Sequence, residues 1–347
     1  MSQHEKYMHR CLELSVKGLG KVAPNPMVGC IITGEDGIAG EGYHEMYGQA
    51  HAEINALNSV KYPASLKKAT LYVNLEPCAH QGKTGPCTDA IIASGIKKVV
   101  VGCTDPNPQV KGKGIEQLVR NGIDVITGVL EKECIDVNKR FFTFYEKNRP
   151  YVILKWAQTS DGLIDRKRTA QETPAKITRG EADMMVHLWR SQEQAIMVGT
   201  QTVIMDNPNL TVRKVAGASP TRVVLDRTMK IPENYHVYDN AAKTIVFTEQ
   251  KINNNHGAEY IPLNFDDELL KNILKELYQK NIQSVIIEGG EKLLNSFITK
   301  DLWDEAKVFY SSETLKEGVP APHFPFPSKG EIRMGDIMLA LYRNKHK

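Results

Sequence analysis

Two short stretches of the sequence hold the kinds of residue that bind zinc. "HAEINAL" contains His51 and Glu53, and "PCAHQGKTGPC" contains Cys78 and Cys87. A catalytic zinc ion typically takes three protein ligands and leaves a fourth position for water. The residue types therefore predict a zinc site formed by His51, Cys78 and Cys87, with one nitrogen and two sulfurs as ligands.

Glu53 suggests what such a site would do. A zinc-bound water can ionise near neutral pH, and a neighbouring carboxylate can carry its proton to a leaving amine. His, Cys, Cys and Glu form the zinc base-deaminase signature, H-x-E followed by P-C-x-x-C. Here eight residues separate Cys78 from Cys87, so the second half of the signature is stretched.

Two alternatives exist for these residues. Cys78 and Cys87 are also suited to packing as small apolar residues, and His51 to capping a helix. A purely structural zinc module would need a fourth ligand, and the first half of the sequence offers no obvious one. The other cysteines, Cys11, Cys30, Cys103 and Cys134, have no such neighbours and are predicted to pack in a core.

The predicted elements place the three ligands near one another. His51 and Cys87 each begin a predicted helix, and Cys78 follows a predicted strand through Pro77. We expect the unpaired amides of the second helix to favour the thiolate of Cys87. The first half of the chain alternates further, with helices predicted over 5–20, 51–60, 87–95, 114–122 and 131–148, and strands over 27–33, 69–75, 97–102 and 123–128.

A second α/β pattern follows the polar stretch "EKNRP". Strand and helix patterns alternate with short connections, which is typical of layered α/β domains. We predict domains over 1–147 and 148–347. The second contains strands over 151–158, 195–199, 221–226, 243–248, 283–288 and 304–310 and helices over 179–192, 266–280 and 291–300.

Composition limits the classes of function. The 347 residues are 41% apolar and 24% charged, and their net charge of +3 argues against a nucleic-acid partner. The N-terminal stretch has no apolar signal region, and no apolar run is long enough to span a membrane. We therefore expect a cytoplasmic enzyme.

The second half also holds groups suited to an anionic cofactor and substrate. Gly289-Gly290 separates a strand from a helix, where free amides can bind a phosphate, although a tight turn is the simpler explanation. Glu288 stands at the end of the apolar strand "SVII", and Lys155 follows the apolar residues "VIL". Lys155 could lie near the reacting sugar carbon, polarising it or donating a proton, or it could extend into solvent. Arg190 and Arg213 could bind phosphate or lie on the surface.

Longer motifs resemble a known family. "PNPMVGC", "GYHEMYGQAHAE", "EPCAHQGKTGPC", "DPNPQVKGKG", "KWAQTSDG" and "IIEGGEKLLNSFI" occur in the order and at the intervals of the bifunctional pyrimidine deaminase–reductases of riboflavin biosynthesis. The resemblance covers nearly the whole chain. It implies a three-layer, cytidine-deaminase-like first domain and a second domain with a dihydrofolate-reductase-like fold.

The resemblance also implies two reactions and their cofactors. The first domain would use Zn²⁺ to deaminate a 2,5-diamino-6-ribosylaminopyrimidinone 5'-phosphate. The second would use NADPH to reduce the ribosyl group to ribityl. A homo-oligomer is expected. The rival prediction is a tRNA or nucleoside deaminase with a C-terminal binding module, which the same zinc chemistry would serve.

The resemblance assigns roles residue by residue. Glu53 would shuttle protons, and Lys155 is the candidate proton donor of the reductase. Around the substrates it places Asn25, His44 and His80 in the deaminase, and Arg190, Leu210, Arg213 and Glu288 in the reductase. Around NADPH it places Ala157, Thr202, Asp206, Thr228, Gly290, Glu291, Lys292, Leu293, Leu294, Asn295 and Ser296.

The sequence departs from the family pattern at three places. Lys176 stands where the family usually has tryptophan, and it is preceded by Thr173-Pro174-Ala175, where the family often has a serine that contacts substrate. Thr159-Ser160-Asp161-Gly162 replaces the usual Ser-Leu-Asp-Gly, so none of these contacts is carried over. Gly85 replaces a proline of the zinc loop, between the retained Thr84 and Pro86, and we expect zinc binding to survive.

Overall fold

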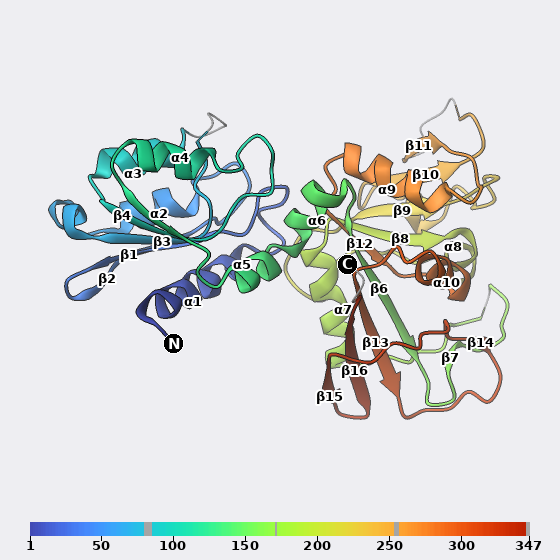
Figure 1. The fold of residues 1–347 in the computed structure, drawn as a ribbon. Helices are drawn as coiled ribbons and strands as arrows, with labels where there is room; N and C mark the ends of the chain where they lie inside the picture. Colours follow the sequence, from blue (N-terminus) through green and yellow to red (C-terminus); the bar gives the residue numbers. More distant parts are fainter. Residues whose placement is uncertain (80–84, 171, 253–256, 345–347) are drawn as a thin grey trace. The chain divides into compact units, whose positions relative to one another are not determined.

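The structure is a computed structural model that describes residues 1–79, 85–170, 172–252 and 257–344. The chain divides into two compact units, Met1–Asn148 and Arg149–Lys347, each built from helices packed on a sheet (Figure 1). Each unit is described by itself. No helix within the described ranges combines the length and apolar character needed to cross a membrane.

The first unit contains one mixed sheet. Its helices are α1 Gln3–Ser15, α2 Ala52–Ser59, α3 Cys87–Ser94, α4 Lys113–Arg120, α5 Glu131–Val137 and α6 Lys139–Lys147, with 3-10 turns at Val16–Gly18 and Pro63–Lys68. Its strands are β1 Gly29–Gly34, β2 Gly37–Tyr43, β3 Thr70–Leu75, β4 Lys98–Cys103 and β5 Asp124–Thr127. The sheet order is β2-β1-β3-β4-β5, antiparallel on the β2 and β1 side and parallel from β3 to β5.

Three layers form because alternate strand residues face opposite sides of the sheet. In β3, Leu71 and Val73 join a core with α2, α3 and α4, whereas Tyr72 joins a core with α1 and α5. Figure 1 shows α3 and α4 above the sheet and α1 and α5 below it. The predicted α/β class and three-layer first unit are confirmed.

Two local features differ from the sequence predictions. Strand β2 was not predicted, because its sequence "GIAGEGY" is rich in glycine and has few apolar residues. The single helix predicted over 131–148 is two helices, α5 and α6, separated at Asn138. Asn138 has φ −99° and ψ 19°, outside the helical values.

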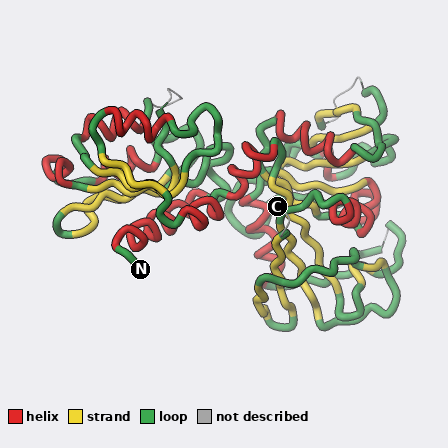
Figure 2. Tube along the Cα trace, in the orientation of Figure 1, coloured by secondary structure: helices red, strands yellow, loops and turns green. Residues whose placement is uncertain are grey.

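The second unit is built on a larger sheet (Figure 2). Its helices are α7 Glu181–Gln192, α8 Thr200–Asp206, α9 Leu269–Gln279 and α10 Glu291–Thr299, with a 3-10 turn at His236–Tyr238. Its strands are β6 Tyr151–Gln158, β7 Leu163–Asp165, β8 Ala195–Gly199, β9 Thr221–Leu225, β10 Thr244–Thr248, β11 Glu259–Pro262, β12 Ser284–Ile287, β13 Glu305–Ser311, β14 Val319–Pro320, β15 Gly330–Met334 and β16 Ile337–Arg343.

The large sheet has the order β11-β10-β9-β8-β12-β6-β13-β16-β15. Its strands run parallel from β11 to β13, and β16 and β15 are antiparallel additions. Helices α9 and α10 pack on one face, and α7 and α8 pack on the other. The carboxyl ends of β6, β8, β9 and β12 therefore meet at one edge, which is where ligands bind in open α/β sheets.

Candidate functional site

His51 is held at the start of a helix that packs tightly on the sheet. It is the N-cap residue of α2 and has an extended backbone conformation. Glycine at position 42 allows this packing, since a Cβ atom there would lie 2.3 Å from the backbone nitrogen of Ala56. The close contact of β2 with α2 thus fixes the position of the His51 backbone, from which the imidazole projects.

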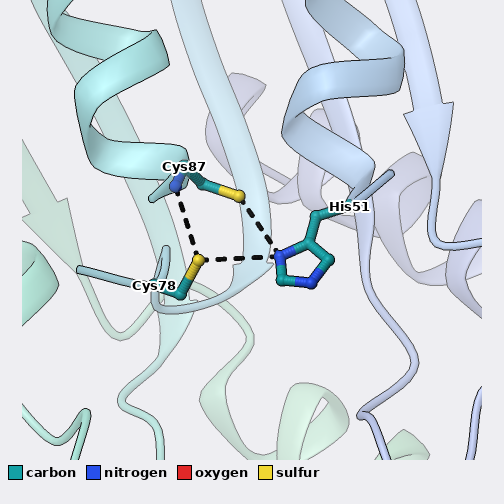
Figure 3. Close-up of side chains that lie close together, drawn as sticks. All are labelled: His51, Cys78 and Cys87. Carbon is teal, nitrogen blue, oxygen red and sulfur yellow. Dashed lines mark hydrogen bonds between the residues drawn. The ribbon is translucent and has the colours of Figure 1, made fainter. Parts of the chain in front are cut away.

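The structure brings the three predicted zinc ligands together (Figure 3). His51 Nδ1 lies 3.3 Å from Cys87 Sγ and 3.6 Å from Cys78 Sγ. One nitrogen and two sulfurs thus lie within 4.8 Å of one another, and no other metal-ligand group was found among the described residues. This donor set fits zinc, which accepts imidazole nitrogen and thiolate sulfur and leaves a position open in catalytic sites.

The two thiols differ in their environment, and the difference corrects one prediction. The N-terminal amide of α3, the backbone N–H of Cys87, donates to Cys78 Sγ at 3.4 Å. Hydrogen bonding from the Cys87 thiol, together with His51 and this amide, lowers the pKa of Cys78. In the same pair of cysteines, the hydrogen bond to the Cys78 sulfur raises the pKa of Cys87. The helix start therefore favours the thiolate of Cys78, not of Cys87 as predicted.

Glu53 lies in the first turn of α2, two residues after His51. Its side chain is buried, and burial followed by the charge of Cys78 raises its pKa to about 7. Its carboxylate also interacts with the Cys87 thiol. A carboxyl group with this pKa can accept and release a proton near neutrality.

Asn25 and His44 lie together beside the ligand group. His44 Nδ1 lies 3.0 Å from the carbonyl oxygen of Ala50, and its Nε2 lies 3.1 Å from Asn25 Nδ2. A carbonyl only accepts, so Nδ1 carries the proton and Nε2 accepts from Asn25. Burial lowers the pKa of His44, which favours this neutral form. The rings of His44 and His51 are 5.2 Å apart. His80 and Thr84 lie outside the described residues.

Glu76, two residues before Cys78, also shapes the site, although the sequence analysis did not identify it. Its buried carboxylate accepts hydrogen bonds from four backbone N–H groups, those of Asp105, Gly112, Gly114 and Ile115. The same segment lies so close to the zinc loop that a Cβ on Gly114 would be 1.9 Å from the carbonyl oxygen of Pro77. Glu76 thereby ties the 105–115 segment to the turn that carries Cys78.

The second unit has a large cavity at the carboxyl edge of its sheet. Its volume is about 1220 Å³. The predicted residues that line it are Lys155, Ala157, Arg190, Thr202, Asp206, Leu210, Glu288, Gly290, Glu291, Lys292, Leu293 and Ser296. Thr228, Arg213, Leu294 and Asn295 do not line it. Leu294 packs in the core, and Arg213 Nη1 donates to Thr211 Oγ1.

A buried charge cluster lies in this cavity. The Glu288 carboxylate lies 2.7 Å from Arg190 Nη2 and 3.9 Å from Lys155 Nζ. Burial alone would raise the pKa of Glu288, but Arg190 and Lys155 outweigh it and lower the pKa to about 2. Burial lowers the pKa of Lys155, and Glu288 opposes this shift. Glu288 is therefore charged, and Lys155 has a reduced affinity for its proton.

The start of α10 lies at the same cavity. Gly290 is its N-cap, and the Gly290 N–H donates to Thr202 Oγ1 at 3.1 Å. A Cβ on Gly290 would meet only that hydroxyl, at 3.6 Å. The free amides of such a helix start suit an anion. These residues, with the cavity's size, fit the phosphates of a dinucleotide.

Arg168 holds together part of the cavity wall, although the sequence analysis did not identify it. Its buried guanidinium contacts the carboxylates of Asp165 and Asp206 and the carbonyl oxygens of Glu172 and Met205. It therefore ties Asp165 and Glu172 to the end of α8. Lys176 and Pro174, which depart from the family pattern, also line the cavity. Lys176 Nζ lies 3.7 Å from the Asp183 carboxylate.

Arg222 holds the segment that carries Leu210. Its buried guanidinium donates to the carbonyl oxygens of Asn209 and His236. Leu210 has φ +56°, a conformation unusual for a non-glycine residue. The Arg213 N–H donates to His187 Nδ1 at 3.1 Å. The sequence carries a signal for Arg222, since a charged residue stands directly before the apolar run "VVL" of a buried strand.

Comparison with known proteins supports both units. Residues 1–103 match the model of the cytidine and deoxycytidylate deaminase zinc-binding region, and residues 150–317 match that of the RibD C-terminal domain. The riboflavin biosynthesis protein RibD of Aquifex aeolicus is 42% identical over 323 residues, which cover 91% of this chain and 88% of that protein. The RibD of Escherichia coli is 34% identical, covering 90% and 89%.

Solved structures agree along nearly the whole chain. A Thermotoga maritima diaminohydroxyphosphoribosylaminopyrimidine deaminase/5-amino-6-(5-phosphoribosylamino)uracil reductase is 38% identical, with a TM-score of 0.88 and 98% of each chain covered. Acinetobacter baumannii RibD is 32% identical, with a TM-score of 0.89 and the same coverage. The match of the second half argues against the nucleic-acid-binding module of the rival prediction.

Proposed function

Because the chain belongs to the RibD family of bifunctional riboflavin-biosynthesis proteins, we propose that its two units catalyse successive steps on one phosphorylated pyrimidine. The first unit hydrolyses the 2-amino group from 2,5-diamino-6-(5-phosphoribosylamino)pyrimidin-4(3H)-one. The second reduces the ribosyl group of the resulting uracil to ribityl with NADPH. The observation that carries this proposal is the nitrogen and two sulfurs gathered within 4.8 Å beside a buried glutamate.

In the deaminase, His51, Cys78 and Cys87 would hold zinc. The ion would supply an activated water for attack on the ring carbon that bears the amine. Glu53 takes the proton from that water and gives it to the departing amine, because its pKa of about 7 suits both transfers. Asn25 and His44 contact the pyrimidine, and His80 is proposed to join them.

In the reductase, NADPH would supply the hydride, with its phosphates on the start of α10 and Thr202. Lys155 donates a proton to the sugar oxygen as the ring opens, since burial weakens its hold on that proton. Glu288 accepts a hydrogen bond from a ribose hydroxyl, and Arg190 keeps Glu288 ionised. The roles of Arg213, Thr228, Leu294 and Asn295 remain proposals from family resemblance. We also propose a cytoplasmic homo-oligomer.

Replacing Glu53→Gln tests the deaminase without removing a metal ligand. The variant should retain zinc, measured by metal analysis, while ammonia release from the diaminopyrimidine substrate falls roughly 100-fold or more. Oxidation of NADPH with the deaminated uracil substrate should be unchanged. The exposed ion pair of Glu35 with Lys68 provides the control, Glu35→Gln, which should leave both activities intact.

Two results would refute the proposal. One is a wild-type protein that holds zinc but releases no ammonia from the diaminopyrimidine. The other is a wild-type protein that oxidises no NADPH when given the deaminated product. Activity on tRNA in the absence of both reactions would instead support the rival prediction.

A further inference from the structure

The segment that carries Asn25 lies outside the sheet and is held by side chains. It precedes β1, and in the described part of the chain the backbone N–H and carbonyl of Met27 are outside the strand pairing, which begins at Gly29. Instead, the Met27 N–H donates to Asn138 Oδ1 at 2.8 Å, and Asn138 Nδ2 donates to the Met27 carbonyl oxygen at 2.9 Å. One side-chain amide thus satisfies both backbone groups of a residue 111 positions away.

A second side-chain amide, that of Asn74, holds the same segment, and we call Asn138 and Asn74 together the clamp. Asn74 in β3 donates from Nδ2 to the same Met27 oxygen at 3.1 Å, and its Oδ1 accepts the Gly29 N–H at 2.8 Å. Asn138 and Asn74 are 2% and 0% exposed, so water does not compete for these bonds. Met27 is therefore fixed from two sides, by the sheet and by the junction of α5 and α6.

The clamp lies two residues from a group that faces the ligand site. Asn25 is held at its backbone by an N–H bond to the Val22 carbonyl oxygen at 2.8 Å, and its Nδ2 is engaged by His44. Among the described residues no partner is found for its Oδ1, which could accept a hydrogen bond from a pyrimidine N–H or amine. A ligand contact of this kind binds well only when its backbone is fixed beforehand.

We propose that Asn138 is a positioning residue for the deaminase, which holds Asn25 in place for the aminopyrimidine through the backbone of Met27. The break between α5 and α6 then has a function, because Asn138 can reach Met27 from a non-helical position. This inference rests on the proposed deaminase function. It gives the junction of α5 and α6 a role in substrate binding, although this junction lies outside the zinc motifs.

The test is Asn138→Ala in the full chain with zinc bound. Losing both bonds to Met27 should raise KM for the diaminopyrimidine roughly 10-fold or more, with a smaller change in kcat. Zinc content should equal that of the wild type, and reductase activity should be unchanged. Asn74→Ala, which removes the second amide, should raise KM in the same direction.

The control must be equally destabilised but distant from the clamp. Leu118→Ala in α4 removes a fully buried core side chain, so it should lower the unfolding temperature without raising KM. If Asn138→Ala does not fold, Asn138→Asp keeps the acceptor for the Met27 N–H and must show the rise in KM instead.

The inference is overturned if the Asn138 variants that fold raise KM no more than Leu118→Ala does, or if they lose zinc in proportion to activity. Failure of the proposed function looks different. In that case the wild type itself releases no ammonia.

Discussion

Arg190 and Glu288 form an ion pair of 2.7 Å in which each side chain is only 12% exposed. Arg190 lies in α7 and Glu288 follows β12, so the pair joins a helix to the carboxyl edge of the sheet. Lys155 lies 3.9 Å from the same carboxylate. Two cations thus face one buried anion, and this local positive excess suits the phosphorylated ligands proposed for the cavity.

Glu288→Gln should impair the reductase alone. It leaves Arg190 and Lys155 buried without their counter-charge, which costs about 3 kcal/mol when one member of a buried pair is removed. We expect kcat/KM for NADPH-dependent reduction to fall roughly 100-fold, with zinc content and ammonia release unchanged.

Glu259→Gln is the matched control for that variant. Glu259 pairs with Lys280 and Lys243 in the same unit, but it lies on β11 and does not line the cavity. A similar loss of reductase activity in both variants would contradict the role of Glu288.

The charge of Glu288 should also appear in the pH dependence of stability. Its folded pKa of about 2 is below the ordinary value of 4.5, so its stabilising contribution is present above pH 4.5 and is lost as the pH falls toward 2. The lost part amounts to roughly 3 kcal/mol. The three tryptophans of the chain, Trp156, Trp189 and Trp303, all lie in the second unit, so their fluorescence in urea reports its unfolding.

Wild type and Glu288→Gln are compared in that measurement. Their difference in unfolding free energy should be constant from pH 7 to about pH 5 and should shrink below pH 4.5. A difference that persists unchanged to pH 3 would show that Glu288 is not held ionised by its neighbours.

Removing a thiolate should abolish the first activity and spare the second. Cys78→Ser should lose bound zinc, because a serine hydroxyl is a poor substitute for the sulfur that zinc prefers. Ammonia release should disappear while NADPH oxidation continues. Cys11→Ser is the control, since Cys11 is buried in the same unit and donates to the Tyr72 carbonyl oxygen, a bond that a hydroxyl can make. Equal zinc loss in both variants would count against Cys78 as a ligand.

Gly114→Ala should disturb the zinc loop from a distance. Its Cβ would lie 1.9 Å from the Pro77 carbonyl oxygen, so the backbone next to Cys78 must move. We expect a loss of stability of about 1–3 kcal/mol and weaker zinc retention during dialysis against a chelator. Gly34→Ala is the control, because its Cβ would meet only Ala39 Cβ, at 3.8 Å. Unaltered zinc retention in Gly114→Ala would show that the contact does not constrain the site.

The zinc group was predictable because its residue types are rare and their spacing is distinctive. His51 and Cys87 mark helix starts, and Cys78 follows an apolar strand, so local patterns placed all three. Which thiolate is favoured was not predictable, because the answer depends on where the Cys87 N–H points. That direction is a property of the assembled loop.

The supporting residues escaped sequence analysis for a related reason. Asn138 and Arg222 act through backbone groups of residues 111 and 13 positions away, and a backbone carbonyl leaves no mark on the sequence. Strand β2 escaped because its glycines serve close packing on α2 rather than strand propensity. The roles assigned to individual site residues remain predictions that the variants above can test.

Glu76 has a practical consequence for anyone who builds chimeras of this enzyme with its relatives. The 105–115 segment takes its shape from a carboxylate in another part of the chain, because four of its peptide groups converge on that one side chain. A transplanted version of this segment will adopt its native course only in a host that supplies an acidic side chain at position 76. Exchange boundaries should therefore keep the two together.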